Sequence, residues 1–160
     1  MTDRKPSITA LIFVGAVATL ARPAPLSAQI DPCKLLTREQ VATVLPNHDG
    51  GSVAHAGPAL IPGVSAYQCS YVDKEFNLLT VILNVAVDDK RFAEIRPGSI
   101  VTDEQQVAVA DGGWVRGDPS DMKLTAVKGR TVIDLELMAP GAGGKIAALV
   151  ALANAVAEKL

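Results

Sequence analysis

The chain has 160 residues, 49% of them hydrophobic and 20% charged, and its formal net charge is −2 at pH 7. A nucleic-acid-binding protein would carry a basic stripe or patch, so this weakly acidic balance argues against that class. The length predicts one domain built around one core.

The first part of the sequence resembles a leader for export. Arg4 and Lys5 precede an uncharged, mostly apolar run over residues 8–21, and Leu-Ser-Ala at 26–28 offers a small residue to signal peptidase. This order is typical of a secretory signal peptide. The apolar run is shorter than the roughly 20 residues that span a bilayer. We expect cleavage after Ala28; an uncleaved N-terminal anchor is the alternative.

The expected mature domain, residues 29–160, lacks a site for lipid attachment. A bacterial lipoprotein needs Cys directly after the small residues, and Gln29 stands there, with Cys33 four residues too late. The leader removes three of the 15 basic residues and one of the 17 acidic ones, which leaves a net charge of about −4. We therefore expect a periplasmic or extracellular monomer with no stable membrane anchor.

Two cysteines, Cys33 and Cys69, are available in the domain. In an oxidising compartment an internal disulfide is the expected state, with two free thiols or an intermolecular bridge as alternatives. The spacing is not that of a Cys-x-x-Cys redox motif.

The first elements are predicted to be a helix and two strands. Thr37 and Gln40 form a capping-box pattern that predicts a helix over 38–45. Residues 46–66 hold four glycines and three prolines without a sustained period, which predicts a long loop. Strands are predicted over 68–72 and 78–87, joined by a polar hairpin.

The longer strand should bury one face. That face carries, at alternate positions, Leu79, Val81, Leu83, Val85 and Val87. Asp88 can cap a short helix through Ile95 that turns Phe92 and Ile95 inward.

The second half predicts a three-stranded meander and a closing helix. Strands are predicted over 113–117, 122–128 and 131–138, and Gly129-Arg130 has the composition of a type II′ hairpin turn. The helix, about 142–160, has an apolar stripe at helical spacing that should dock on a sheet. The stripe consists of Ile146, Leu149, Leu152, Ala153, Val156 and Leu160.

The fold class that follows is α+β. We expect an antiparallel sheet of about five strands with helices packed on one or both of its faces, in the order α-β-β-α-β-β-β-α.

Two stretches resemble a known family. Asp-Pro-Cys-Lys-Leu-Leu-Thr at 31–37 and Cys-Ser-Tyr at 69–71, before a long strand, are similar to the opening of the domain-of-unknown-function 3558 family, mostly actinobacterial exported lipoproteins. The likeness continues through Gly-Gly-Trp at 112–114 and the closing helix. It implies a compact exported domain with a Cys33–Cys69 bridge, and it implies no reaction. Gln29 departs from the lipid-anchored pattern.

Residues 46–66 hold the only candidates for metal or acid–base chemistry. His48, Asp49 and His55 have the ligand types that Zn²⁺ prefers, but their spacing matches no metal signature. Ser52 and Ser65 lack the Gly-x-Ser-x-Gly context of a hydrolase nucleophile. Solvent-exposed histidines in a loop are the simpler interpretation, and we expect no metal and no cofactor.

A second candidate site surrounds Trp114. Adjacent glycines at 112 and 113 permit a close backbone approach, Trp114 could stack on a ligand such as a sugar, and Arg116 follows on the same strand. The simpler interpretation is a Trp that anchors the core or a hairpin. Gly141–Gly144 lacks the Lys-Ser/Thr of a phosphate loop and is interpreted as a connector.

The sequence favours an exported, non-enzymatic binding or envelope-associated module with a protein or small-molecule partner. It would use its sheet face or the 46–66 segment. One alternative is a carrier of a small apolar ligand between the sheet and the C-terminal helix. The other is a small hydrolase or metal-dependent enzyme centred on His48 and His55.

Overall fold

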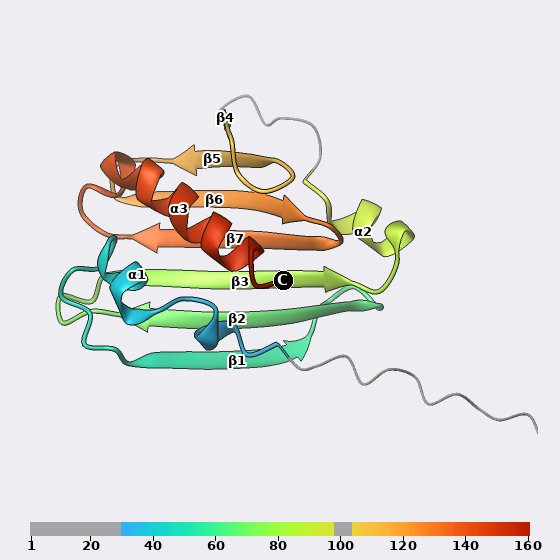
Figure 1. Ribbon diagram of the computed structural model, residues 1–160, viewed down its shortest axis with the longest axis horizontal. Helices are drawn as coiled ribbons and strands as arrows, with labels where there is room; N and C mark the ends of the chain where they lie inside the picture. Colours follow the sequence, from blue (N-terminus) through green and yellow to red (C-terminus); the bar gives the residue numbers. More distant parts are fainter. Residues whose placement is uncertain (1–29, 98–103) are drawn as a thin grey trace, which may run out of the picture.

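The computed structural model describes residues 30–97 and 104–160, so the predicted leader and its cleavage site lie outside the described residues. One seven-stranded sheet, with every neighbouring pair antiparallel, has the strand order β1-β2-β3-β7-β6-β5-β4 (Figure 1). The strands are β1 (Ser52–Pro58), β2 (Val64–Val72), β3 (Leu78–Ala86), β4 (Gln105–Val107), β5 (Gly113–Gly117), β6 (Asp121–Lys128) and β7 (Thr131–Met138). The α-helices are α1 (Arg38–Ala42), α2 (Asp89–Ile95) and α3 (Ile146–Ala157), and the 3₁₀ helices are η1 (Pro32–Lys34) and η2 (Ala142–Lys145).

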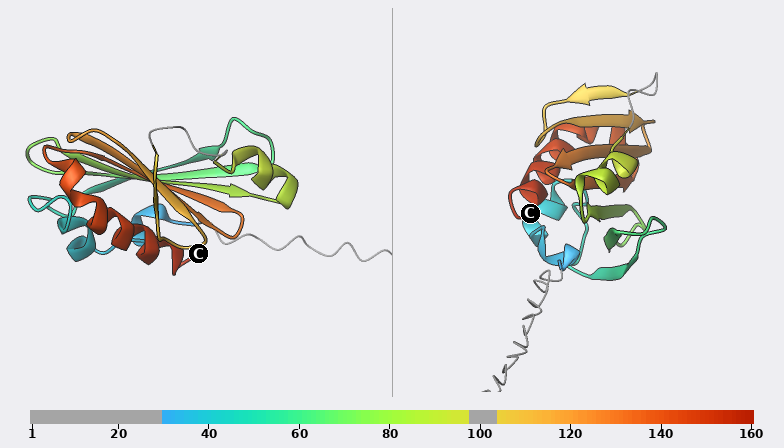
Figure 2. Two further views of the ribbon diagram at one scale, coloured as in Figure 1. Left: turned by 90° about the horizontal axis from the view of Figure 1, so that it is seen from above. Right: turned by 90° about the vertical axis from the view of Figure 1, so that its right-hand side faces the viewer.

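The helices divide the sheet into two unlike faces. Figure 2 shows α1, α3 and η1 together on one side, which we call the core face; we call the other side the open face. On β3 the predicted alternation is confirmed, because Leu79, Val81 and Leu83 are fully buried on the core face. The domain is therefore a two-layer α+β structure, as the sequence predicted in its coarser form.

Helix α3 closes the core with the predicted stripe. Leu149, Leu152 and Val156 are buried against the sheet, and each such side chain contributes about 1.5–3 kcal/mol to folding. Two lysines fix the helix to the N-terminal segment. Lys145 Nζ donates to the carbonyl of Val44 and Lys159 Nζ donates to that of Leu35, both at 2.6 Å.

The predicted internal disulfide is confirmed between Cys33 and Cys69, with the Cα atoms 5.2 Å apart. It ties η1 to β2. Asp31 caps η1 by accepting from the N–H of Cys33 at 3.1 Å, and the hydroxyl of Tyr71 donates to the carbonyl of Cys33 at 3.4 Å. Burial, with the negative charge of Asp31, raises the pKa of Tyr71 to about 12, so this donor stays protonated at physiological pH.

The prediction of five strands and a long 46–66 loop was wrong. Residues 52–58 form β1, and β2 begins at Val64, four residues before the predicted start. Every residue from Ser52 to Ala56 is exposed, so this part of the strand has no buried face and leaves no apolar alternation in the sequence. The other unpredicted strand, β4, is three residues long, which is too short to show a period.

The element ends differ from the predictions by a few residues. The capping box of α1 is present, but the helix ends at Ala42. The N–H and the hydroxyl of Thr43, its C-cap, both donate to the carbonyl of Gln40, at 3.1 and 2.7 Å. Val87 lies beyond the end of β3 and is exposed, so its predicted place in the core was wrong.

The two later helices are also shifted. Asp88 caps α2 as predicted, although Phe92 and Ile95 are only half-buried. The closing helix starts as a 3₁₀ turn and ends at Ala157, which leaves Leu160 exposed.

The predicted two-residue turn between β6 and β7 is confirmed. Gly129 has φ +55, and Lys128 and Thr131 on either side of the turn pair with each other. Arg130 keeps a negative φ, which fits type II′ rather than type I′.

Aspartate side chains accept hydrogen bonds from the backbone of several turns. We therefore predict that the domain loses stability in acid. Asp118 accepts from the N–H groups of Ser120 and Asp121, and Asp111 accepts from that of Gly129. These bonds hold the pKa of both carboxyls below the ordinary value of 3.8. A carboxyl with a lowered pKa in the folded state stabilises the fold above its unfolded pKa, and this contribution is lost as pH falls through the folded value.

We therefore expect the urea midpoint of unfolding to be nearly constant from pH 7 to pH 5 and to fall below about pH 4. Asp118→Asn should flatten this dependence, because the amide accepts the same bonds without titrating. A wild-type midpoint that is unchanged between pH 5 and pH 3 would contradict the assignment.

Candidate functional site

The open face is the side of the sheet opposite α1, α3 and η1. A helix approaches it only at one end of β2 and β3, where Ile95 of α2 lies near Ala66 and Asn84. The strand register brings together on it one row of side chains from every strand. In strand order that row is His55, Gln68, Ile82, Asp134, Thr125, Trp114 and Gln106.

Charge is divided unequally along this face. Strands β1, β2 and β3 contain no Asp, Glu, Lys or Arg. The open-face charges of the other half come from β5, β6 and β7, with one residue that precedes β4. They are Glu104, Arg116, Asp121, Lys123, Asp134 and Glu136.

Lys123 joins two strands at the centre of the charged half. Its Nζ lies 3.0 Å from Glu136 Oε1 and 3.4 Å from Asp134 Oδ2. Asp134 also accepts from the hydroxyl of Thr125 at 2.5 Å. Burial alone would lower the pKa of Lys123, but the two carboxylates outweigh it and raise the pKa above its ordinary 10.5. The ammonium therefore stays charged and fixes β6 to β7.

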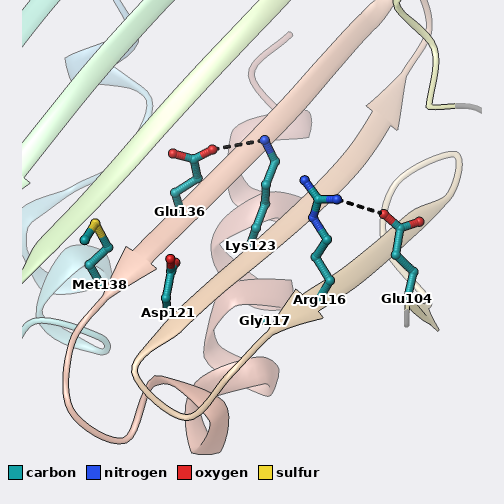
Figure 3. A pocket seen from close by; sticks show the side chains of 7 residues that line it. All are labelled: Glu104, Arg116, Gly117, Asp121, Lys123, Glu136 and Met138. Atoms are coloured by element: carbon teal, nitrogen blue, oxygen red, sulfur yellow. Dashed lines mark hydrogen bonds and ion pairs between the residues drawn. The ribbon is translucent and has the colours of Figure 1, made fainter. Parts of the chain in front are cut away.

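Arg116 is held more loosely. Its Nη1 is 3.9 Å from Glu104 Oε1, which is beyond hydrogen-bond distance, and half of its side chain is exposed. Within the described residues it makes no other ion pair. With Asp121 and Met138 it borders a hollow of about 550 Å³ (Figure 3). The hollow thus contains a guanidinium whose donors are available to a ligand.

The predicted pair Trp114 and Arg116 lies on one face of β5, two residues apart. By register, Trp114 is placed between Thr125 of β6 and Gln106 of β4, and it is half-buried. One edge of the ring system approaches Gly112. The structure thus places both residues on the open face, beside the charged cluster.

His48 and His55 do not meet. His48 is buried, with Nδ1 3.2 Å from the carbonyl of Val72 and its ring edge-on to Tyr71 at 5.6 Å between centroids. This imidazole therefore has a structural role in the fold. The expectation that the histidines are exposed in a loop was wrong for His48. His55 is exposed on β1, five strand spacings or roughly 24 Å from Trp114.

The other candidates of the 46–66 segment have local roles. Asp49 accepts from the N–H of Gly51 at 2.9 Å. Ser52 pairs with Tyr71 and Ser65 with Pro58, at opposite ends of β1. In residues 30–97 and 104–160, no group of three or more His, Cys, Asp or Glu side chains could hold a metal ion.

Sequence reasoning did not select Lys123, Asp134 or Glu136 as site residues, although a signal was present. The two-residue turn at 129–130 pairs Lys128 with Thr131, and counting back from it places Lys123 opposite Glu136. The predicted two-residue turn therefore already implied that Lys123 and Glu136 lie opposite each other. Glu104 had no such signal, because the strand that follows it was not predicted.

The space between the sheet and α3 is filled by side chains. Leu124, Leu135 and Leu149 are fully buried there. A carrier of an apolar ligand needs a lined cavity at this place, so the packing counts against that alternative.

Comparisons with known proteins add no relative: no family model, no curated protein and no solved structure matches the chain. Among the described helices, none is long and apolar enough to cross a membrane.

Proposed function

We propose that this chain is an exported, non-enzymatic binding domain, and that the charged half of its open face binds a hydroxyl-rich ligand such as a sugar. The observation that carries the proposal is Arg116, half-exposed in a hollow, on the same face of β5 as Trp114. An indole stacks on the apolar face of a sugar ring, while a guanidinium and carboxylates bond its hydroxyl groups.

The dimensions and the chemistry of the hollow agree with this class of ligand. A volume of about 550 Å³ lies within the range of small-molecule sites, roughly 300–1,000 Å³. Asp121 and Glu136 supply acceptors and Arg116 supplies donors. A sugar hydroxyl can use both, because it donates and accepts.

Export is part of the same proposal. A disulfide persists in an oxidising compartment and is rare in the cytosol, so the Cys33–Cys69 bridge supports export. The bridge also supports kinship with the domain-of-unknown-function 3558 family, which we keep as a proposal.

The test is a fluorescence titration with the trisaccharide of N-acetylglucosamine as the probe. Trp114 is the only tryptophan, so its emission reports on the open face of β5, two residues from Arg116. We expect saturable quenching, and we expect Arg116→Ala to weaken binding by about tenfold or more, because a bond to a charged donor contributes about 1.5–3 kcal/mol.

Lys128→Ala is the matched control. Lys128 is a half-exposed cation on β6 that pairs with Asp111 outside the hollow. Its replacement should leave the titration unchanged. If equal weakening were seen in both variants, the effect would be one of net charge, and the proposed site would be wrong. Absence of quenching by the trisaccharide would remove the sugar as the ligand class.

A further inference from the structure

The two edges of the sheet are built differently. Strand β4 has three residues, whereas β1 has seven and pairs with β2 without interruption from Ser52↔Tyr71 to Pro58↔Ser65. Proteins usually protect an edge with short strands, charged residues, bulges or proline. The edge at β4 is short, but β1 has no charged residue and no bulge, and its proline is the last residue.

The direction of the main-chain groups of β1 follows from the hydrogen bonds at its end. The N–H of Ala59 donates to the carbonyl of Val64 at 3.4 Å, which continues the β1–β2 ladder as a bonded pair. In an antiparallel ladder bonded and non-bonded pairs alternate. The residues that bond to β2 are therefore Val53, His55 and Gly57.

The alternate residues direct their N–H and C=O groups away from the sheet. These are Ser52, Ala54 and Ala56, followed by Pro58, which has a carbonyl but no N–H. The bond from the N–H of Asp73 to the carbonyl of Asn77 gives β2 the same alternation from its other side. Pro58 thus occupies a position where its missing donor costs no ladder bond.

Among the described residues, the edge strand itself is exposed and neutral. η1, which carries Lys34 beside Asp31, lies near it on the core face. Residues Ser52 to Ala56 are all exposed, and the outward-bonding residues among them carry small side chains. The neighbouring strands β2 and β3 contain no Asp, Glu, Lys or Arg. On the open face of this edge, an incoming segment with charged side chains would lose hydration without gaining an ionic partner from β1, β2 or β3.

We propose that the outer edge of β1 is a strand-addition site for an uncharged, extended segment of another protein. Main-chain bonds to Ser52, Ala54 and Ala56 would supply the affinity, and alternate side chains of the segment would supply the specificity. A second copy of this chain fits less well, because it would contribute only the same edge of seven residues. A stable interface buries at least about 1,200 Å² in total.

A peptide with the sequence of residues 64–72, with Cys69 replaced by Ser, is the probe. This sequence is uncharged and already pairs antiparallel with β1 on its inner side. Amide hydrogen exchange of the full domain is followed by NMR with and without the peptide. Before addition, we expect slow exchange at Val53, His55 and Gly57 and fast exchange at the alternate residues.

At a peptide concentration of about ten times Kd, exchange at Ser52, Ala54 and Ala56 should slow by about tenfold. This alternating pattern separates strand addition from side-chain docking. Unchanged exchange, or protection at β5–β7 instead, would overturn the proposal. Protection that rises with protein concentration alone, with a dimer mass by sedimentation, would assign the edge to a second copy and would also overturn it.

Two variants sharpen the test. Ala54→Pro removes an outward N–H and no ladder bond, so it should retain the fold and abolish peptide binding. Arg116→Ala should leave peptide binding unchanged, so failure of this site and failure of the sugar site are distinguishable. If Ala54→Pro unfolds, the exchange pattern of the wild-type domain still decides the question.

Discussion

Removing the Cys33–Cys69 bridge is expected to lower the free energy of unfolding by about 3–4 kcal/mol, the chain-entropy value for a loop of this size. The bridged residues are 36 positions apart. A domain of this size has a total stability of about 5–15 kcal/mol. The loss should therefore lower Tm by about 10–20 °C.

The position of the bridge explains why little else could replace it. Cys33 belongs to a 3₁₀ helix of three residues, which cannot hold its own position, and Cys69 is fully buried in β2. The segment that follows η1 buries Val41, Val44 and Leu45 completely. Without the bridge, these apolar side chains are retained by packing and by hydrogen bonds, among them those that Lys145 and Lys159 donate from either end of α3.

The measurement is thermal unfolding by circular dichroism of the oxidised domain, the reduced domain and the Cys33→Ala, Cys69→Ala double variant. Reduction removes the cross-link with little change in volume, whereas the double variant also removes two sulfur atoms from the interior. Similar losses in both would assign the effect to the cross-link. A Tm that falls by less than about 3 °C on reduction would contradict the prediction.

The local signals of the sequence were accurate where one turn or one face decides the outcome. The capping box at Thr37 and Gln40, the cap at Asp88 and the hairpin at Gly129 each depend on neighbouring residues, and the structure has all three. The buried face of β3 was also predictable, because its alternation reflects contact with a core on one side only.

Strand β1 was not predictable in the same way. Its residues 52–56 are exposed on both faces, and its sequence ends in Gly57 and Pro58, so neither apolar alternation nor composition distinguishes it from a loop. Its strand character comes from pairing with β2, which is a tertiary effect. The hollow was less predictable still. Arg116 of β5, Glu136 of β7 and Glu104, which precedes β4, are far apart in the sequence, and only the sheet order brings them together.

Gly117→Ala is the second change from which we expect a large effect. Gly117 ends β5 with φ +134, a backbone conformation that L side chains rarely adopt. A Cβ there would overlap the carbonyl oxygen of Asp121 and lie 2.9 Å from the Cα of Met122. Both obstacles are backbone atoms, so no rotamer change can relieve them. Strain and displacement together should cost about 3 kcal/mol or more.

Gly144→Ala is the matched control. A Cβ at Gly144 meets nothing within 4 Å, and the residue belongs to η2. Alanine there should be neutral or should stabilise by about 0.4–1 kcal/mol, because it reduces the freedom of the unfolded chain. Urea unfolding of both variants compares the same substitution in a closed and in an open site.

The comparison also tests the role of Gly117 in the hollow. Gly117 lines it next to Arg116, at the point where β5 turns towards Asp118. If the turn moves to accommodate a Cβ, Arg116 moves with it, so the trisaccharide should bind more weakly to any Gly117→Ala protein that remains folded. Equal stability of the two alanine variants would show that β5 and β6 are not held this close. Reduced binding together with reduced stability would show that the same close contact holds the edge of the sheet and positions the guanidinium.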